Sequence, residues 1–129
     1  MQQQPDAEIR LPAETAYVAV LRMAASGIAA RLDFTLDDVD DLKMAVSEAC
    51  AMVLADATPG GSMYADFVLG EGRIEVSVAA DSVNADPPDP GSFAWQVLAT
   101  TAAEVSAAAS HDRVSISLTI TSSTTNAPA

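Results

Sequence analysis

Glu48 is the residue whose type and setting point most clearly to chemistry. It lies inside the apolar stretch MAVSEACAMVLADA at residues 44–57, and it is the only charged residue between Lys43 and Asp56. A carboxylate buried among apolar groups would be poised to act as a general base. The alternative is a partly exposed glutamate on the rim of a surface helix, and the local pattern by itself favours that alternative.

The helical periodicity around Glu48 predicts what surrounds it. At 100° per residue one stripe is apolar and should face a core, and it comprises Val39, Leu42, Val46, Ala49, Cys50 and Val53. The opposite side carries Met44, Glu48, Ala51, Met52 and Ala55. A simple surface helix would carry Lys, Glu or Gln there. We therefore expect this second face to be at least partly covered by another helix, a subunit or a partner.

The other reactive side chains do not form a catalytic or metal-binding set. Cys50 is the only cysteine, and it fits the apolar stripe as a small core residue. His111 is the only histidine, and it has no second His or Cys with which to hold a metal. We expect a turn residue there and no metal site. Phe93 and Trp95 are predicted to anchor the core rather than to stack on a ligand.

The composition is typical of one acidic domain. The chain has 129 residues, half of them apolar, and a net charge of −12. That charge repels phosphate backbones and anionic lipid, so we expect no direct binding to nucleic acid or membrane. The N-terminus lacks a signal-peptide pattern, and no apolar stretch is long enough to span a bilayer. These features favour a cytoplasmic location.

The elements that must position Glu48 read as a mixture of strands and helices. Residues 7–13 predict a short strand, and Glu14–Leu32 predicts a helix. Thr35 is a suitable N-cap with Asp38 three residues later, so the helix that carries Glu48 should run from Leu36 to Ala57. The remaining predictions are a hairpin of residues 63–69 and 73–80 around Gly70-Glu71-Gly72, a loop at 81–91, a helix at 92–109 and an alternating, half-buried strand at 112–122.

This order predicts an α+β fold. Its simplest form is a two-layer sandwich, in which three helices cover one face of a mainly antiparallel sheet of four to five strands. One domain should span residues 1–121, beginning with a loose arm at 1–6. The Ser/Thr-rich tail at 122–129 is predicted to be disordered.

One long stretch resembles a known family. The run LPAETAYVAVLRMAASGIAARLDFTLDDVDDLKMAVSEAC is similar to the first half of the RsbW/SpoIIAB family. These are bacterial anti-sigma factors with the GHKL, or Bergerat-like, ATPase fold, and many are also serine kinases. The similarity covers most of residues 8–121 and is strongest over 11–50. It looks especially like a degenerate actinobacterial branch, and it implies the GHKL fold for this chain.

The resemblance assigns roles to single positions. Glu48 matches the base that the family uses in serine phosphorylation, but Met52 stands where the family has the asparagine that holds Mg²⁺. A thioether is a poor ligand for Mg²⁺, because that ion requires hard oxygen donors. Asp81 matches the aspartate that recognises the adenine amino group, although Val83 and Ala85 replace the glycines that follow it.

The phosphate-binding loops are altered as well. Ser92-Phe93-Ala94 stands where the family has Gly-x-Gly, and side chains there would crowd a triphosphate. Residues 82–91 leave only ten positions for the lid that folds over ATP. Phosphoryl transfer depends almost wholly on positioning and charge neutralisation. The resemblance therefore implies that the catalytic role of Glu48 has lapsed. We expect no cofactor, and ATP with Mg²⁺ would bind only if the pocket survives these changes.

The implied function is protein binding. Arg22 matches a first-helix arginine with which the family contacts both the sigma factor and its antagonist; the bland alternative is a solvated helix charge. The expected partners are an alternative sigma factor, an anti-anti-sigma antagonist and a second copy of the chain in a homodimer. One alternative is an active ATP-dependent serine kinase of a STAS-type antagonist. Another is a GHKL-derived module with a different protein partner.

Overall fold

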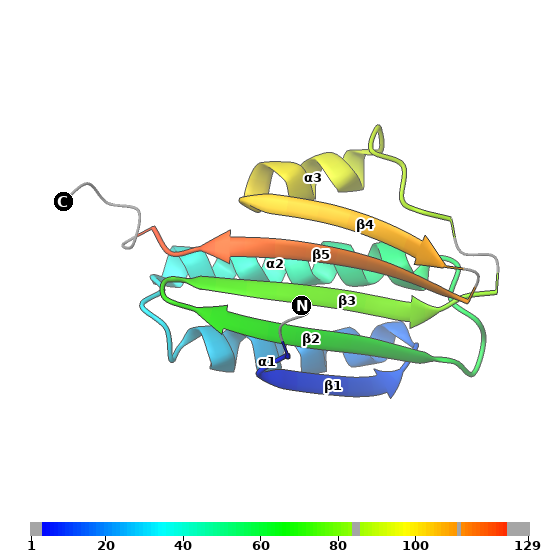
Figure 1. The fold of residues 1–129 in the computed structure, drawn as a ribbon, viewed down its shortest axis with the longest axis horizontal. Coiled ribbons are helices and arrows are strands. Elements are labelled where there is room, and N and C mark those ends of the chain that lie inside the picture. Colours follow the sequence, from blue (N-terminus) through cyan, green and yellow to red (C-terminus); the bar gives the residue numbers. More distant parts are fainter. Residues whose placement is uncertain (1–3, 84–85, 111, 124–129) are drawn as a thin grey trace.

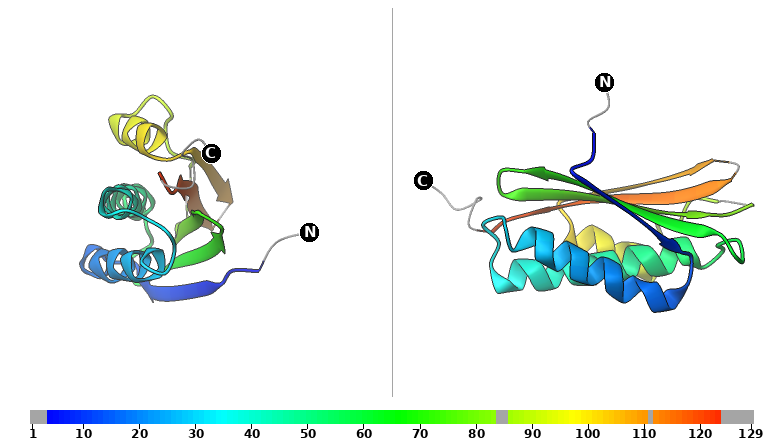
Figure 2. Two further views of the ribbon diagram at one scale, coloured as in Figure 1. Left: turned by 90° about the vertical axis from the view of Figure 1, so that its left-hand side faces the viewer. Right: turned by 90° about the horizontal axis from the view of Figure 1, so that it is seen from below.

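The computed structural model describes residues 4–83, 86–110 and 112–123, and within them five strands form one antiparallel sheet (Figure 1). The strand order is β1-β2-β3-β5-β4. Three α-helices of this described part lie on one face of the sheet, and the other face is open (Figure 2). The expected α+β two-layer architecture is confirmed. No helix in the described ranges is long and apolar enough to cross a membrane.

The elements follow one another along the chain as β1 (Ala7–Pro12), the 3₁₀ turn η1 (Thr15–Tyr17), α1 (Val18–Ala29), α2 (Leu36–Leu54), β2 (Ser62–Gly70), β3 (Arg73–Asp81), α3 (Phe93–Thr101), β4 (Glu104–Ser110) and β5 (Arg113–Thr121). Figure 2 shows α2 lying between α1 and α3 in the helix layer. The helix that carries Glu48, α2, is therefore the central helix of that layer.

The alternation of strand residues separates a core face from a polar face. Residues that point toward the helices are buried, among them Met63, Ala65 and Phe67 on β2, Ile74, Val76 and Val78 on β3, and Val114, Ile116 and Leu118 on β5. The residues between them point to the open face. There Ser77 and Ser117 lie directly opposite each other, and their hydroxyl oxygens form a hydrogen bond of 2.7 Å. The clean alternation predicted for β5 is thus confirmed.

The hairpin between β2 and β3 closes as the sequence predicts. Gly70 pairs with Arg73, which leaves Glu71 and Gly72 as a two-residue loop. Gly72 has a φ of 67°, a left-handed conformation that glycine adopts without a steric penalty.

The helix predicted at 92–109 is wrong in its second half. The helix α3 ends at Thr101, and Glu104–Ser110 forms β4 along the edge of the sheet beside β5. Alanine favours helices, but the alternation of Val105 and Ala107 lets this segment pair with β5 and contact the core. Pairing with a neighbouring strand has overridden local propensity.

The other element boundaries differ by a few residues from those predicted. The central helix ends at Leu54 rather than Ala57, and the first helical segment is split into η1 and α1. At the N-terminus, Asp6 is held by its own N–H on the Phe67 carbonyl at 2.7 Å and by its carboxylate on the Leu69 N–H at 2.8 Å. His111, Ala85 and residues 124–129 lie outside the described residues.

Asp38 joins the beginning of α2 to Ser123, which follows β5. It forms a capping box with Thr35, whose N–H donates to Asp38 Oδ2 at 3.0 Å. The N–H and hydroxyl of Ser123 donate to the same oxygen at 3.1 and 3.0 Å. Ser122 is fully buried and donates its hydroxyl to the Asp33 carbonyl. The first two residues of the predicted tail are therefore bound to the connection between α1 and α2 and to the beginning of α2.

These hydrogen bonds set the protonation of Asp38. Burial raises the pKa of its carboxyl group, but the hydrogen bonds from Thr35 and Ser123 outweigh burial and hold the pKa below 3.8. A carboxylate with a depressed pKa in the folded state stabilises the protein above its unfolded-state pKa. That contribution is lost as the pH falls through the folded-state pKa.

We predict that Asp38→Asn lowers the free energy of unfolding at neutral pH by about 1–2 kcal/mol, because the cap and the Ser123 donors lose a charged acceptor. The difference from wild type should shrink as the pH falls below about 4. Urea denaturation at several pH values measures both effects. Asp40→Asn, at an exposed acid on the same helix, is the control and should leave stability nearly unchanged. An equal loss in both variants would contradict the role of the cap.

Candidate functional site

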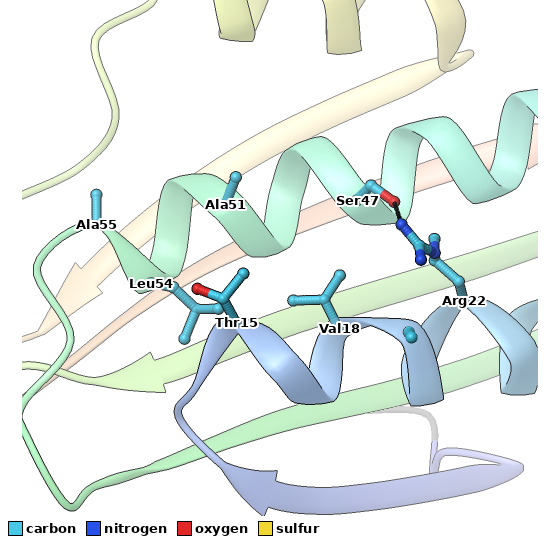
Figure 3. Close-up of a pocket in the computed structure, with 8 residues that line it drawn as sticks. Thr15, Val18, Arg22, Ser47, Ala51, Leu54 and Ala55 are labelled. Atoms are coloured by element: carbon cyan, nitrogen blue, oxygen red, sulfur yellow. Dashed lines mark hydrogen bonds between the residues drawn. The ribbon is translucent and has the colours of Figure 1, made fainter.

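A hollow of about 500 Å³ lies between α1 and α2 on the outer side of the helix layer (Figure 3). Its walls are mostly apolar and are formed by Thr15, Val18, Ala19, Arg22, Ser47, Ala51, Leu54 and Ala55. Arg22 reaches across from α1, and its Nη1 donates to the Ser47 hydroxyl on α2 at 3.4 Å. The hollow is thus an apolar surface with one cation at its edge.

The packing of α1 places Arg22 at this hollow. Leu21, Ala25 and Ala29 are buried on the core side of the helix, which turns the neighbouring Arg22 toward α2 and leaves it exposed. The structure therefore places the predicted partner-binding residue on an accessible surface. Ser47, which orients it, was not anticipated. The sequence feature that could have identified Ser47 is its polar side chain beside the apolar stripe of α2.

Cys50 lies beneath this surface and is not a reactive thiol. Its side chain is fully buried, as the apolar stripe predicted. Burial raises the pKa of the Cys50 thiol to about 12, although the nearby charge of Arg22 acts in the opposite direction. Because only the thiolate is nucleophilic, Cys50 is a core residue at neutral pH.

Glu48 and Met52 lie one turn apart on α2. Because Ser47 faces α1, the 100° spacing places Glu48 and Met52 on the side of α2 that is turned toward α3. Met52 is partly buried and packs against the core. Glu48 is partly exposed, as expected for a glutamate on a helix rim.

The second face of α2 is largely open within the chain. Met44 is 52% exposed, and Ala51 and Ala55 are exposed too. The described part of the chain covers only Glu48 and Met52, and these only partly. Within the described residues, the cover that the sequence predicts for this face is therefore only partial.

Asp81 lies on the other side of the sheet from Glu48. Its neighbour Ala80 points to the helices and is fully buried, so Asp81 points to the open face. There its carboxylate accepts hydrogen bonds from the Ser62 N–H at 2.9 Å and from the Tyr64 hydroxyl at 3.1 Å. The structure does not bring Asp81 and Glu48 to a common pocket.

A cluster of charged and aromatic groups surrounds Asp81. The Arg113 guanidinium lies 3.8 Å from its carboxylate and 4.0 Å from the centre of the Tyr64 ring. Arg10 lies 5.7 Å from the same ring and bonds Ser62. These contacts connect β1, β2, β3 and β5. They give Asp81 a structural role that the sequence did not reveal. The strand register would have been needed to find it.

Ser92 and Ala94, which the resemblance assigns to the phosphate loop, lie at the beginning of α3. Ser92 is the N-cap, and its hydroxyl accepts a hydrogen bond from the Trp95 N–H at 3.2 Å. An anion at this helix end would compete with that cap. Ala94 and Trp95 are partly exposed, whereas Phe93 is 83% exposed, so the prediction that Phe93 anchors the core is wrong. Phe93 points outward because Leu98 is the buried residue of α3.

Comparison with known proteins places this arrangement in a family. A family model described as "Histidine kinase-like ATPase domain" matches residues 11–96. The chain is similar to the proteins named "Serine-protein kinase RsbW" of Bacillus thuringiensis (strain Al Hakam) and Bacillus anthracis. Each is 38% identical over 81 residues, which are 61% of this chain and 51% of the relative. The chain thus spans about half the length of the curated relatives it matches.

A solved structure agrees with the fold. The RsbU and RsbW domains of Rv1364c from Mycobacterium tuberculosis match with a TM-score of 0.64 and 17% identity. The match covers 91% of this chain and 33% of that one. At this identity the likeness concerns the fold alone.

We predict that Asp81→Ala lowers the free energy of unfolding by about 1–3 kcal/mol, because the Ser62 N–H and the Tyr64 hydroxyl lose their acceptor. Thermal and urea denaturation measure the effect. The matched control is Asp66→Ala. Asp66 lies on β2, on the same open face of the sheet as Asp81, and it is directly opposite Glu8. Its loss should leave stability unchanged or raise it. A stable Asp81→Ala protein would contradict the structural role of Asp81.

Proposed function

This chain belongs to the histidine kinase-like ATPase domain family, with RsbW proteins among its relatives, and we propose that it is an anti-sigma factor that sequesters an alternative sigma factor by direct binding. In this proposal the GHKL fold serves as a docking scaffold, in the cytoplasm and as a homodimer. An anti-anti-sigma antagonist would release the sigma factor by competing for the same surface, without phosphorylation.

The observation that carries the proposal is the separation of Glu48 from Asp81 by the sheet. A kinase of this family would need its base and its adenine contact around one nucleotide. Here Asp81 is engaged by Ser62 and Tyr64 on the open face, while Glu48 stands in the helix layer. Phosphoryl transfer depends on positioning, so this separation supports binding rather than catalysis.

The groups that would hold Mg²⁺ and ATP also fit poorly. Met52 offers a soft thioether that packs against the core, where Mg²⁺ requires oxygen ligands. At the beginning of α3, the Ser92 hydroxyl already accepts the Trp95 N–H, and the Ala94 Cβ replaces a glycine hydrogen. No step of the proposed function therefore passes through ATP.

The hollow between α1 and α2 supports the docking of a protein. Its apolar walls are accessible, and Arg22 supplies a charge at their edge. An exposed apolar surface with a positioned arginine is a common form of protein interface. The uncharged outer side of α2 at Ala51 and Ala55 has the same explanation, since a bound partner would cover it.

Glu48 favours a second candidate function, an ATP-dependent serine kinase acting on a STAS-type antagonist. Glu48 stands at the position of the family base, and relatives of this chain are named serine-protein kinases. A kinase of this kind would still need a Mg²⁺ ligand in place of Met52.

We predict that one alternative sigma factor of the source organism binds the purified chain, and that Arg22→Glu weakens this binding at least tenfold. Calorimetric titration measures the dissociation constant. Arg31→Glu is the control, because Arg31 is an exposed cation just beyond α1 and outside the hollow. If no sigma factor binds the wild-type chain, the proposed function is wrong.

We predict that the wild-type chain gives no heat and no thermal shift with ATP and Mg²⁺ at millimolar concentration, because no oxygen ligand stands at Met52. The same titration of the triple variant Met52→Asn, Ser92→Gly, Ala94→Gly tests whether the residues that the family has at these positions restore nucleotide binding. Phosphorylation of an antagonist by the wild type, abolished by Glu48→Ala, would establish the kinase instead.

A further inference from the structure

A second hollow continues the one at Arg22. It also measures about 500 Å³ and is lined by Ala19, Arg22, Met23, Ser26 and Lys43. The two hollows share Ala19 and Arg22, so together they form one groove along α1 and α2. We call this surface the α1–α2 groove.

The α1–α2 groove has the length of a short helix. On the α1 side its lining extends from Thr15 to Ser26. At a rise of 1.5 Å per residue this segment is roughly 16 Å long, which corresponds to about three helical turns. The backbone groups of both helices are bonded within the helices, so the groove offers no free edge to which an extended strand could add.

The rim of the groove is apolar and adaptable. Met23, which lines the groove on α1, is 75% exposed. Long unbranched methionine side chains adjust to a partner and are frequent at binding surfaces. Together with the walls at Val18 and Leu54, they suit the apolar face of a helix.

The charge of the groove is opposite to that of the chain. The protein has 18 acidic and 6 basic residues, yet among the described residues that line the groove two are cations and none is an acid. Arg22 contacts Ser47, which lies one turn after Lys43 on α2. The Arg22 guanidinium therefore lies beside α2 about one helical turn beyond the backbone position of Lys43.

We propose that the α1–α2 groove receives an amphipathic helix of the partner, whose apolar face lies against Val18 and Leu54 and whose two carboxylates, one turn apart, meet Arg22 and Lys43. The inference rests on the proposed function in that the docked protein is the sequestered sigma factor. It adds the chemistry of the recognised element, and it makes Lys43 a residue that determines specificity. A basic helix would be repelled by both cations.

The first test uses two synthetic helical peptides and does not require the natural partner. Both carry leucines at i, i+4 and i+7 spacing, and beside them either two glutamates or two lysines four residues apart. Amide NMR shifts of the chain are followed during titration. We expect the glutamate peptide to shift Ala19, Ser47 and Ala51, and the lysine peptide to leave them unmoved. Lys43→Glu should weaken the glutamate peptide about tenfold.

Other outcomes of this titration overturn the inference. They are shifts that map away from the groove, equal shifts with both peptides, or a glutamate peptide that binds wild type and Lys43→Glu alike. Arg31→Glu serves as the matched control, because it removes an exposed cation that lies outside the groove. Lys43 is exposed, so its substitution should not disturb folding.

The second test separates this inference from the proposed function. The dissociation constant of the sigma factor is measured with wild type, Lys43→Glu and Met23→Ala. A sigma factor that binds all three equally would leave the anti-sigma function standing and overturn the groove as its docking site. A glutamate peptide that binds in the groove, with no sigma factor binding the wild type, would support the groove and reject the sigma factor as its partner.

Discussion

The packing of the α2 stripe on the sheet is the constraint on which the rest of the structure depends. Leu42, Val46, Ala49 and Val53 are fully or almost fully buried. Burial of a leucine or valine side chain contributes about 1.5–3 kcal/mol. With this stripe held against the sheet, α2 cannot rotate about its axis. Its other residues then have fixed directions: Ser47 toward α1, Ala51 and Ala55 outward, and Glu48 and Met52 toward α3.

A second constraint acts through the sheet. Successive side chains of a strand alternate between faces, so Ala80 and Asp81 cannot both point to the helices. The buried side chains of β3 assign the core face to Ala80. Asp81 is consequently drawn into the contacts with Ser62, Tyr64 and Arg113, where it holds the ends of three strands together. A residue that matches a nucleotide contact by sequence thereby becomes a structural carboxylate by register.

The sequence predicted most of the fold because most of its signals were local. The capping box at Thr35, the stripe of α2 and the alternation of β5 each arise from neighbouring residues, and each is confirmed. The strand β4 was missed because it depends on pairing with β5. The alanine-rich sequence of residues 104–110 does not indicate that pairing. The environment of Asp81 was missed for the same reason, since Tyr64 and Arg113 approach it only through the sheet register.

In the proposed function, the two flanks of α2 separate the docking surface from the positions that match the family's catalytic residues. The groove uses the side of α2 that faces α1, through Lys43 and Ser47, whereas Glu48 and Met52 lie on the side toward α3. A difference from the family on the α3 side, such as Met52 at the position that the resemblance assigns to a Mg²⁺ ligand, therefore leaves the groove and its charges in place. A core stripe that fixes the rotation of α2 keeps the proposed docking surface in place when residues on the α3 side change. In physical terms, a chain of this fold can lose the parts of a kinase and retain the geometry of a binding protein.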